Sequence, residues 1–528
     1  KSPYWWAGAL VASIAPAWFL HSRTAFETVL AVSFYAAFLY LYLLYRCRSP
    51  RFLYVAVAMA ALTFYTYSPA QIYVTLTCLA LLVLDARYHW QNRRTALKAV
   101  VLGLALTLPY VRFRFNHPEA ATQHLAQLNS YWLEDIPVLE KIRRFGGEYL
   151  YGLSPAYWFV SHGDDLPRHV MKGYGHLLRP TLPFLVLGLI MSFRWVRQPQ
   201  YRVLLVSFLA APAGAAVVEV GITRMLVFIV PASLMITLGI SQVLEWLERF
   251  RLPRAALASG LFALLALANL WMLRDVLANG PTWFSDYGLH GMQFGAREVF
   301  SAIDDYLEKN PRGKIYLATS WANGADMLAR FFLPDPVPIE MAGIDGFLRE
   351  VRTIEDNALF ILPANEYEQA IESEKFEEFR VESVIQYPNG DPGFYLAHFR
   401  YREDIDEIMA EELELRRRLI EETMVRDGDQ YDVRYSVLDM GQITDVFDQD
   451  PLSVARTGGV NPFVLELIYD EPRAISGYEI IIGSADGELR TFVYQDQDQV
   501  PLEFSTMFQG TIEQPVVQVE FGQTIQAV

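Results

Sequence analysis

Apolar residues dominate the first half of the chain, in runs of membrane length that short polar turns separate. The runs that we expect to cross a membrane as helices are Tyr4–Leu20, Ala25–Tyr45, Phe52–Tyr67, Ile72–Leu84, Ala96–Val111, Leu182–Phe193, Val203–Val220, Met225–Trp246 and Ala255–Leu273. Beyond about residue 275 the pattern becomes that of a water-soluble protein. The chain is therefore predicted to be mainly α-helical and polytopic, with about nine transmembrane helices in a domain over residues 1–275.

Every second turn between these runs is rich in arginine or lysine, which predicts the orientation of the helices. The basic turns, expected in the cytoplasm, contain Arg46, Arg48, Arg51, Arg87, Arg93, Arg94, Lys98, Arg194, Arg197, Arg202, Arg249, Arg251 and Arg254. The opposite turns are His21–Arg23, Tyr67–Gln71, the long loop 112–180 and Gly221–Arg224. Nine spans then place the C-terminal half outside the cytoplasmic membrane.

The outer loop 112–180 is too long for a simple connection. Its middle carries apolar residues at helical spacing, namely Trp132, Ile136, Leu139, Ile142 and Phe145. This spacing predicts amphipathic helices along the outer surface of the membrane. The same apolar face could instead pack on neighbouring helices, and the two interpretations do not exclude each other.

Residues 276–400 alternate between helical and strand patterns, which predicts a small extracytoplasmic α/β domain. Expected helices are Glu298–Glu308, Trp321–Phe332 and Glu366–Glu374; expected strands are Lys314–Ala318, Ala358–Leu362 and the hairpin Val381–Tyr387 with Gly393–Phe399. Residues 401–430 are expected to be a linker with a charged helix over 403–426. Short strands in 431–528 predict a β-sandwich, expected to be incomplete because the sequence stops soon after a strand.

The formal net charge of −16 comes from the last part of the chain. Residues 401–528 contain 9 Lys and Arg against 27 Asp and Glu. Without a basic stripe to neutralise phosphates, nucleic acid is excluded as a partner. Cys47 and Cys78 both lie in the apolar half, so no disulfide framework holds the remaining domains together.

The outer turns resemble the GT-C class of membrane glycosyltransferases, in the branch of the protein O-mannosyltransferases and the lipid A aminoarabinose transferase (glycosyltransferase family 39 type). APAWFLHSRTAFET (Ala15–Thr28) is similar in its Pro16, Arg23 and Glu27, and LTFYTYSPAQIY (Leu62–Tyr73) resembles the next outer turn. The Ser-Pro, Gly-Asp and Arg-His pairs within Tyr149–Leu189, and ITRMLVFIVPASLM (Ile222–Met235), are also similar. The resemblance covers roughly residues 1–275 and implies transfer of a sugar from a polyprenyl-phosphate carrier.

The chain also departs from this family in one respect. The family's catalytic acidic residue lies in the first outer loop, which has no counterpart here, so the resemblance implies that the N-terminal spans and the main general base lie upstream. Residues Ile443–Ser484 resemble the start of a discoidin-type, galactose-binding-like sandwich, a fold that binds carbohydrate or serves as a spacer.

Glycosyl transfer from a lipid phosphate needs a base or metal to activate the acceptor and a cation to stabilise the leaving phosphate. Arg23 and Arg224 lie at outer ends of spans and are the candidate phosphate ligands, although either could extend to lipid headgroups instead. Glu27 lies four residues after Arg23, so it either pairs with that arginine on one helix face or serves the acceptor or a metal.

Asp164 and Asp165 form either a second acidic pair at the mouth of the site or a solvated turn. Tyr67 and the loop residues His162, Arg168 and His169 are candidates for substrate contact; the two histidines are more typical of hydrogen-bonded loop residues than of metal ligands. No metal ligand is assigned, although a divalent cation could assist.

The sequence thus predicts an enzyme, a polyprenyl-phosphate-sugar-dependent glycosyltransferase integral to the cytoplasmic membrane. Its partners would be the donor lipid, membrane lipid and a glycan, lipid or protein acceptor. The alternative is a non-catalytic membrane-anchored subunit that displays protein- or glycan-binding domains on the outer side.

Overall fold

A computed structural model describes residues 4–24, 26–250, 252–283, 294–426, 429–448, 453–457, 460–482, 486–496, 499–509 and 516–528. Ala25 and Arg251, which belong to a predicted span and a predicted basic turn, lie outside these ranges. The chain forms two compact units. One consists of Lys1–Arg312, Ala318–Met341 and Ser383–Tyr395, and the other of Gly313–Leu317, Ala342–Glu382 and Leu396–Val528. The domain boundaries expected at 275, 400 and 430 stay predictions.

The chain is 55% helical and ends in a strand-rich region, as the sequence predicts. Helical stretches long and apolar enough to cross a membrane are Glu27–Cys47, Arg93–Asn116, Ile222–Glu248 and Arg254–Thr282. The apolar helices Phe52–Thr66 and Ser68–Leu84 have 15 and 17 residues, respectively. At about 1.5 Å per residue they fall short of the ~30 Å hydrocarbon core. The described residues therefore supply four candidate spans and do not support nine.

The helices of the apolar half follow one another with connections of different length, the longest between Phe159 and Leu182. They are α1 (Ala7–Ser13), α2 (Pro16–His21), α3 (Glu27–Cys47), α4 (Phe52–Thr66), α5 (Ser68–Leu84), α6 (Ala86–Gln91), α7 (Arg93–Asn116), α8 (Ala120–Gln127), α9 (Val138–Leu153), α10 (Pro155–Phe159), α11 (Leu182–Arg194), α12 (Pro199–Ala210), α13 (Ile222–Met225), α14 (Ile229–Glu248) and α15 (Arg254–Asn279). Short 3₁₀ turns are η1 (Pro167–His169), η2 (Arg179–Thr181), η3 (Ala211–Gly214), η4 (Leu226–Phe228) and η5 (Gly280–Thr282).

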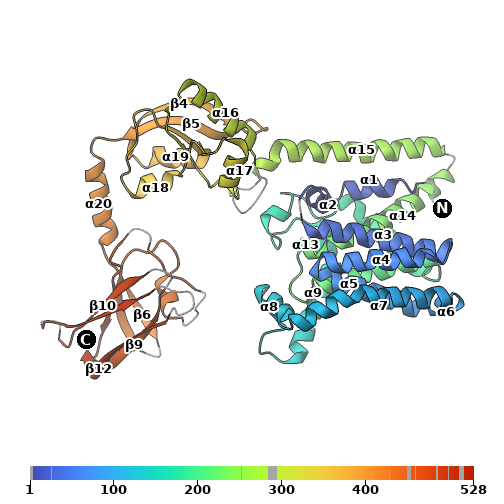
Figure 1. The fold of residues 1–528 in the computed structure, drawn as a ribbon, viewed down its shortest axis with the longest axis horizontal. Coiled ribbons are helices and arrows are strands. Elements are labelled where there is room, and N and C mark those ends of the chain that lie inside the picture. Colours follow the sequence, from blue (N-terminus) through green and yellow to red (C-terminus); the bar gives the residue numbers. More distant parts are fainter. Residues whose placement is uncertain are drawn as a thin grey trace. The chain divides into compact units, whose positions relative to one another are not determined.

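Neighbouring helices make up the bundle, with α3 against α4, α4 against α5 and α7, and α11 against α14. Figure 1 shows α3, α4, α5 and α7 side by side. Two glycines let α11 and α14 approach closely. A Cβ on Gly188 would lie 2.0 Å from the Met235 carbonyl oxygen, and one on Gly239 would lie 2.1 Å from that of Phe184. Small residues at a crossing permit backbone contact that any larger side chain would prevent.

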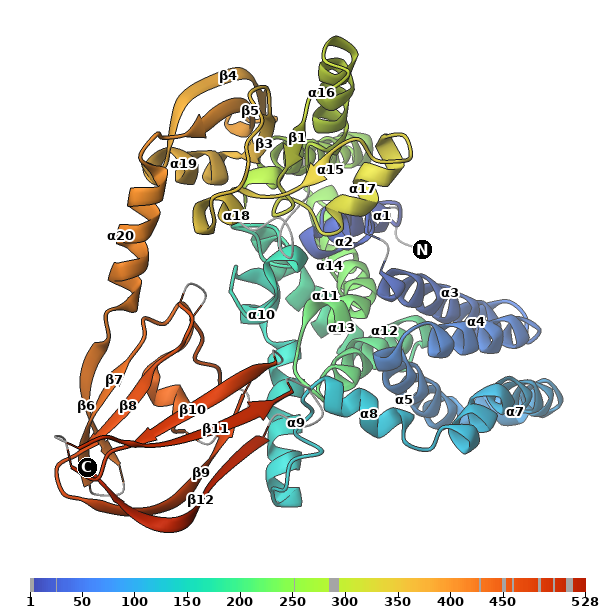
Figure 2. The same cartoon turned by 60° about the vertical axis from the view of Figure 1, so that its left-hand side comes forward.

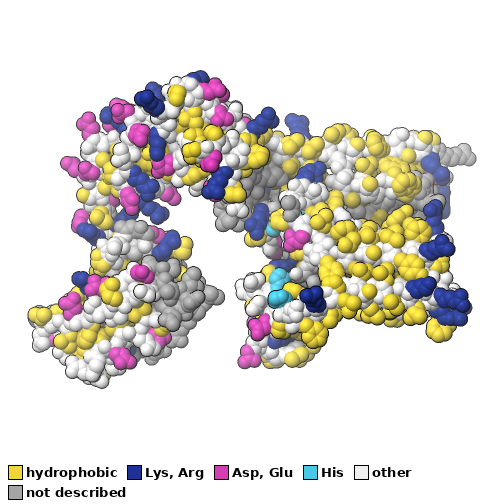
Figure 3. Space-filling view, viewed as in Figure 1, with side chains coloured by type: hydrophobic (Ala, Val, Ile, Leu, Met, Phe, Trp, Pro, Cys, Tyr) yellow, Lys and Arg dark blue, Asp and Glu magenta, His cyan; other side chains and the backbone are white. Residues whose placement is uncertain are grey.

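The surface of this bundle has the polarity of a membrane protein. Hydrophobic side chains cover the faces of α3, α4 and α7, and Lys and Arg side chains gather at the end where α6 lies (Figure 3). Leu104, Leu108 and Trp271 are among the apolar side chains that stay exposed. A contiguous apolar surface over several helices is typical of a face that contacts lipid or a partner. The end occupied by α2 and α13 lies opposite the basic end (Figure 1).

The long outer loop is partly helical, through α8, α9 and α10. The helix expected around Trp132 begins only at Val138, because Pro137 precedes it in an extended conformation that suits a helix start. Trp132 and Ile136 therefore lie outside the helix, which corrects the prediction. Leu139 and Ile142 do lie on α9, where their side chains are 78% and 55% exposed. This exposure fits an amphipathic helix at a surface.

The predicted α/β elements are present with shifts of a few residues, and the structure adds helix Ile344–Arg349 and strand Glu340–Met341, which were not predicted. Helices are α16 (Ala296–Lys309), α17 (Ala325–Phe332), α18 (Ile344–Arg349) and α19 (Ala364–Glu372); strands are β1 (Ile315–Leu317), β2 (Glu340–Met341), β3 (Leu359–Pro363), β4 (Phe376–Gln386) and β5 (Pro392–Tyr401). β1 pairs with β3 in parallel, and β3, β5 and β4 continue that sheet. α17 begins four residues later than expected, after Gly324 in a left-handed conformation.

The charged helix predicted for 403–426 ends early. α20 spans Ile405–Arg417, and Ile420–Arg426 forms strand β6 instead. β6 pairs antiparallel with β7 (Asp429–Tyr435), so sheet pairing overrides the local helical propensity.

Five more strands follow, and Figure 2 shows the long pair β9 and β12 side by side. They are β8 (Leu465–Tyr469), β9 (Arg473–Ile481), β10 (Gly487–Val493), β11 (Leu502–Phe508) and β12 (Val516–Ala527). They make sheets in the orders β6-β7-β8, β10-β11 and β12-β9. This confirms a strand-rich C-terminal region, while the discoidin-like fold stays a prediction.

Candidate functional site

The turn before α13 is the point where several predicted site residues meet. Gly221 is extended (φ −155°, ψ 145°), and Ile222 starts the helix with its backbone N–H directed at Asp165 Oδ1, 2.6 Å away. A Cβ on Gly221 would lie 3.5 Å from Arg224 Nη1 and 3.6 Å from Asp165 Oδ1. The Asp165 carboxylate and the Arg224 guanidinium therefore approach the same turn from two segments of the chain.

Asp165 is buried, and three donors hold its carboxylate. These are the N–H of Ile222, the hydroxyl of Tyr157 at 3.1 Å and Nε2–H of His176 at 2.9 Å. Burial by itself raises the pKa of Asp165. The hydrogen bond and charge of His176, together with the hydrogen bonds from the Ile222 N–H and the Tyr157 hydroxyl, outweigh burial, so the pKa of Asp165 lies below its usual value. Asp165 is thus a stable anion that fixes the loop to α13, and a poor proton acceptor near neutral pH.

The loop reaches this position through its own local signals. Ser154 caps α10 by accepting a hydrogen bond from the Ala156 N–H at 3.1 Å. The chain then doubles back, and the Leu177 N–H donates to the Trp158 carbonyl at 2.7 Å. Gly175 permits the crossing, because a Cβ there would lie 2.6 Å from the Phe159 carbonyl carbon. His176 is thereby placed beside Asp165.

His162, Asp165 and His176 form a group whose donor atoms lie within 4.8 Å of one another. Two imidazoles and a carboxylate are a donor set suited to Zn²⁺ or a related ion. Each member also has a protein partner: His162 Nε2 lies 2.9 Å from the Tyr157 carbonyl, and His176 donates to Asp165. Burial lowers the pKa of His176, and the hydrogen bond to Asp165 and the charge of that carboxylate oppose this effect. No metal ligand was predicted from the sequence, so this grouping comes from the tertiary structure alone.

His21 and His169 form a second, adjoining group. Their rings are buried and stacked, with centroids 5.4 Å apart and planes at 18°. Within the described part of the chain, His21 Nε2 and His169 Nδ1 have no hydrogen-bond partner. Burial, assisted by the charges of His21 and Arg168, lowers the pKa of His169 to about 4. Burial also lowers the pKa of His21, so both rings are neutral at pH 7.

Glu27, Tyr67 and Arg224 lie on the other side of the turn. Thr28, next to Glu27 at the start of α3, donates to the Thr223 carbonyl at 2.7 Å. Burial raises the pKa of Tyr67, and the negative charge of Glu27 raises it further. A hydrogen bond with Thr223 and the positive charge of Arg224 act in the opposite direction. Glu27 is exposed, whereas Tyr67 is half-buried. Outer turns far apart in the sequence therefore converge here.

Arg224 has unused hydrogen-bonding capacity. Nη1 donates to the Glu219 carbonyl at 3.1 Å, and no described carboxylate forms an ion pair with it. A guanidinium has five N–H donors, so most of the donors of Arg224 remain available to a ligand.

Arg23 does not join this group. It stacks on Phe19, with its guanidinium carbon 3.7 Å from the ring centroid, and donates to the Phe19 carbonyl and to Ser22 Oγ. The helix face expected to carry both Arg23 and Glu27 is absent, because α2 ends at His21 and α3 begins at Glu27. Among the described side chains no ion pair joins these two residues. The possible pairing of Arg23 with Glu27 is therefore wrong.

Asp164 and Arg168 have local partners. The hydroxyl of Tyr151 donates to Asp164, whose side chain is 53% exposed, and His162 Nδ1 lies 3.5 Å from the same carboxylate. Arg168 Nε donates to His169 Nε2 at 3.3 Å. Asp164 and Asp165 therefore do not act as a matched acidic pair, since only Asp165 is buried.

Sequence reasoning left His176 and Tyr157 out of the predicted site. His176 does belong to the cluster of ionisable residues within Tyr149–Leu189, whereas nothing in the sequence marks Tyr157. They lie 11 and 8 residues from the carboxylate that they hold. A cavity of about 610 Å³ was also missed; it lies between α9 and the segment before α13, and its charged lining includes Glu134, Arg144 and Glu219. Arg144 is already paired with Glu134 at 3.0 Å.

No protein-family model, curated protein or solved structure matches the chain. The glycosyltransferase and discoidin resemblances therefore rest on the quoted sequence segments alone.

Proposed function

We propose that the chain acts as a membrane glycosyltransferase that transfers a sugar from a polyprenyl-phosphate carrier to an acceptor outside the cytoplasm. The observation that carries the proposal is the convergence of Arg224, Glu27 and Tyr67 at the turn that Asp165 anchors. This turn lies at the end of the bundle opposite the basic end (Figure 1). The headgroup phosphate of a lipid carrier would lie at the same depth.

The residues have different roles in this proposal. Arg224 binds the carrier phosphate through its unused donors, and Arg23 serves the same lipid from the neighbouring turn. Glu27, an exposed carboxylate near Tyr67, assists the acceptor. Asp165 is a positioning residue, because three donors already occupy its carboxylate.

We extend the proposal to the number and orientation of the membrane helices. The shorter apolar helices would complete about nine spans by packing beside the four long ones, with the basic turns in the cytoplasm and residues 276–528 outside. Protease added to sealed, right-side-out vesicles should then digest the C-terminal half of the chain. Protection of that half would contradict the orientation and the outer site together.

The assay for the proposed function is donor affinity and turnover with a short polyprenyl-phosphate sugar, in the full-length protein. A bidentate contact in a partly dry site is worth about 3 kcal/mol, so Arg224→Ala should lower turnover at limiting donor about a hundredfold. Arg224→Lys keeps the positive charge but lacks the planar guanidinium, so it should recover only part of the lost turnover.

The matched control is Arg143→Ala, since Arg143 is an exposed arginine of the outer loop that pairs with Glu140 at 2.7 Å. It should keep the wild-type donor affinity. If Arg224→Ala and Arg143→Ala both behave as wild type, Arg224 is not the phosphate ligand. If the full-length protein binds no carrier at all, the non-catalytic subunit becomes the better description.

A further inference from the structure

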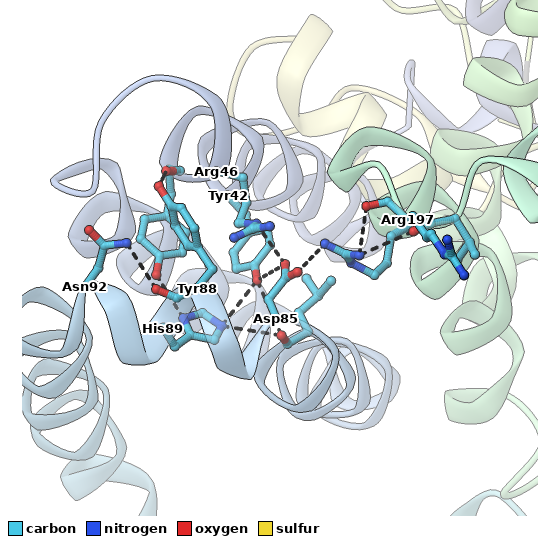
Figure 4. A network of polar contacts seen from close by, with 11 residues as sticks. Tyr42, Arg46, Asp85, Tyr88, His89, Asn92 and Arg197 are labelled. Carbon is cyan, nitrogen blue, oxygen red and sulfur yellow. Dashed lines mark hydrogen bonds and ion pairs between the residues drawn. The ribbon is translucent and has the colours of Figure 1, made fainter.

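A buried ionic network lies at the opposite, basic end of the bundle. Asp85, at the C-terminal end of α5, is almost fully buried, with 1% of its side chain exposed. Arg46 of α3 and Arg202 of α12 both form ion pairs with it. Tyr42 donates to Asp85 Oδ2 at 2.7 Å, and Figure 4 shows Tyr42 and Arg46 beside Asp85. The network thus ties three helices together.

The network carries more positive than negative charge. The side chains of Arg46 and Arg202 are 11% and 12% exposed. Among the residues that the structure describes, Asp85 is the only carboxylate that forms an ion pair with either arginine. One buried positive charge is therefore unbalanced. An unbalanced buried charge is costly, because its attraction to a partner does not repay its loss of water.

The guanidinium groups also have unused donors. Arg46 Nη1 and Arg202 Nε are buried and have no hydrogen-bond partner among the residues that the structure describes. Arg46 Nε is 3.1 Å from Asp85 Oδ2 but is not aligned for a hydrogen bond. Buried donors are normally satisfied, so these atoms indicate a missing acceptor.

The rest of the network holds Arg46 in place. Its guanidinium carbon lies 3.9 Å above the Tyr88 ring, and Tyr88 donates to the Tyr45 carbonyl at 2.9 Å. His89 Nδ1 lies 2.9 Å from the Tyr45 hydroxyl (Figure 4). A guanidinium that is stacked in this way is pre-organised, which lowers the entropy lost when it binds a ligand.

We propose that Arg46 and Arg202 bind one phosphate group at this end of the bundle. A phosphate supplies the missing negative charge, and its oxygens match the geometry of the guanidinium fork. The arginine-rich turns around the network favour an anion further (Figure 3). The phosphate could belong to an anionic lipid headgroup or be free in solution. This site is separate from the outer turn and does not depend on the proposed function.

The test measures Tm of the full chain in uncharged detergent at constant ionic strength. One arm adds phosphatidic acid, with phosphatidylcholine as the uncharged comparison, and the other adds inorganic phosphate. A ligand near a hundredfold excess over its Kd should raise Tm by about 4 °C or more. A response to phosphatidic acid alone identifies a headgroup site, and a response to both identifies a general phosphate site. No response in either arm overturns the proposal.

Two variants tie the response to the network. Arg46→Gln leaves Asp85 and Arg202 as a neutral pair, so Tm without ligand should stay close to wild type while the response to phosphate disappears. Arg93→Gln removes an exposed arginine of the neighbouring basic turn and should keep the full response.

If Arg46 were only a structural clamp, Arg46→Gln would lower Tm without ligand and the wild type would not respond to phosphate. Should Arg46→Gln fail to fold, Arg46→Lys keeps the charge without the fork and should show a weakened response. A full response in Arg46→Gln or Arg46→Lys would overturn the assignment.

Discussion

Acid should destabilise the apolar half of this protein through His169. Burial lowers the pKa of that ring from 6.5 to about 4, so the folded state resists a proton that the unfolded chain accepts. The two states bind protons equally above pH 6.5, and stability is lost as pH falls from 6.5 towards 4. Each pKa unit corresponds to about 1.4 kcal/mol, so the two units between pH 6.5 and pH 4.5 contribute about 2.5 kcal/mol of destabilisation at pH 4.5.

The perturbation that isolates this effect is His169→Phe. A phenyl ring can still stack on His21 and contact Phe26, whose centroid lies 5.2 Å from the His169 ring, but it cannot be protonated. Tm of the full chain in detergent should be measured at pH 7.5 and pH 4.5. The fall in Tm should be smaller in the variant by about 4–8 °C.

The matched control is His124→Phe, because His124 is exposed on α8. It should leave the pH dependence of Tm unchanged. His21 and His176, whose pKa values burial also lowers, should preserve part of the acid sensitivity in His169→Phe. If His169→Phe loses as much stability as wild type between the two pH values, His169 does not titrate as its burial requires.

Two further substitutions test the anchoring turn and the helix crossing. Asp165→Asn keeps the shape of the side chain but removes the negative charge that three donors share. The free energy of unfolding should fall by about 3 kcal/mol, and binding of the donor lipid through Arg224 should weaken. An unchanged Tm would refute the anchoring role. Gly239→Ala places a Cβ 2.1 Å from the Phe184 carbonyl oxygen and should lower the free energy of unfolding by at least about 2 kcal/mol. The control Gly260→Ala, which has open space around the new Cβ, should leave stability unchanged or raise it slightly. Equal effects of the two glycine changes on Tm would contradict the close crossing.

The periodicity of the sequence was sufficient to predict most local elements. Long apolar runs predicted helices, short apolar runs predicted β1 and β3, and the turn between two strand-like segments predicted the hairpin of β4 and β5. These signals are local, because side-chain spacing decides which face of a helix or strand is apolar. The order of basic and non-basic turns likewise predicted two chemically different ends of the bundle, which Figure 3 displays at the α6 end.

Other features depended on residues far apart in the sequence. Ile420–Arg426 has a helical composition but pairs with β7, a choice that local propensity cannot make. The sequence suggested that Asp164 and Asp165 could form an acidic pair, yet only Asp165 meets Ile222, 57 residues away, and becomes a buried anion. Likewise, Asp85 gains its second arginine, Arg202, from a helix 117 residues later. Sequence patterns determine which residues turn inward, but burial and charge balance depend on which segments meet, and only the tertiary structure decides that.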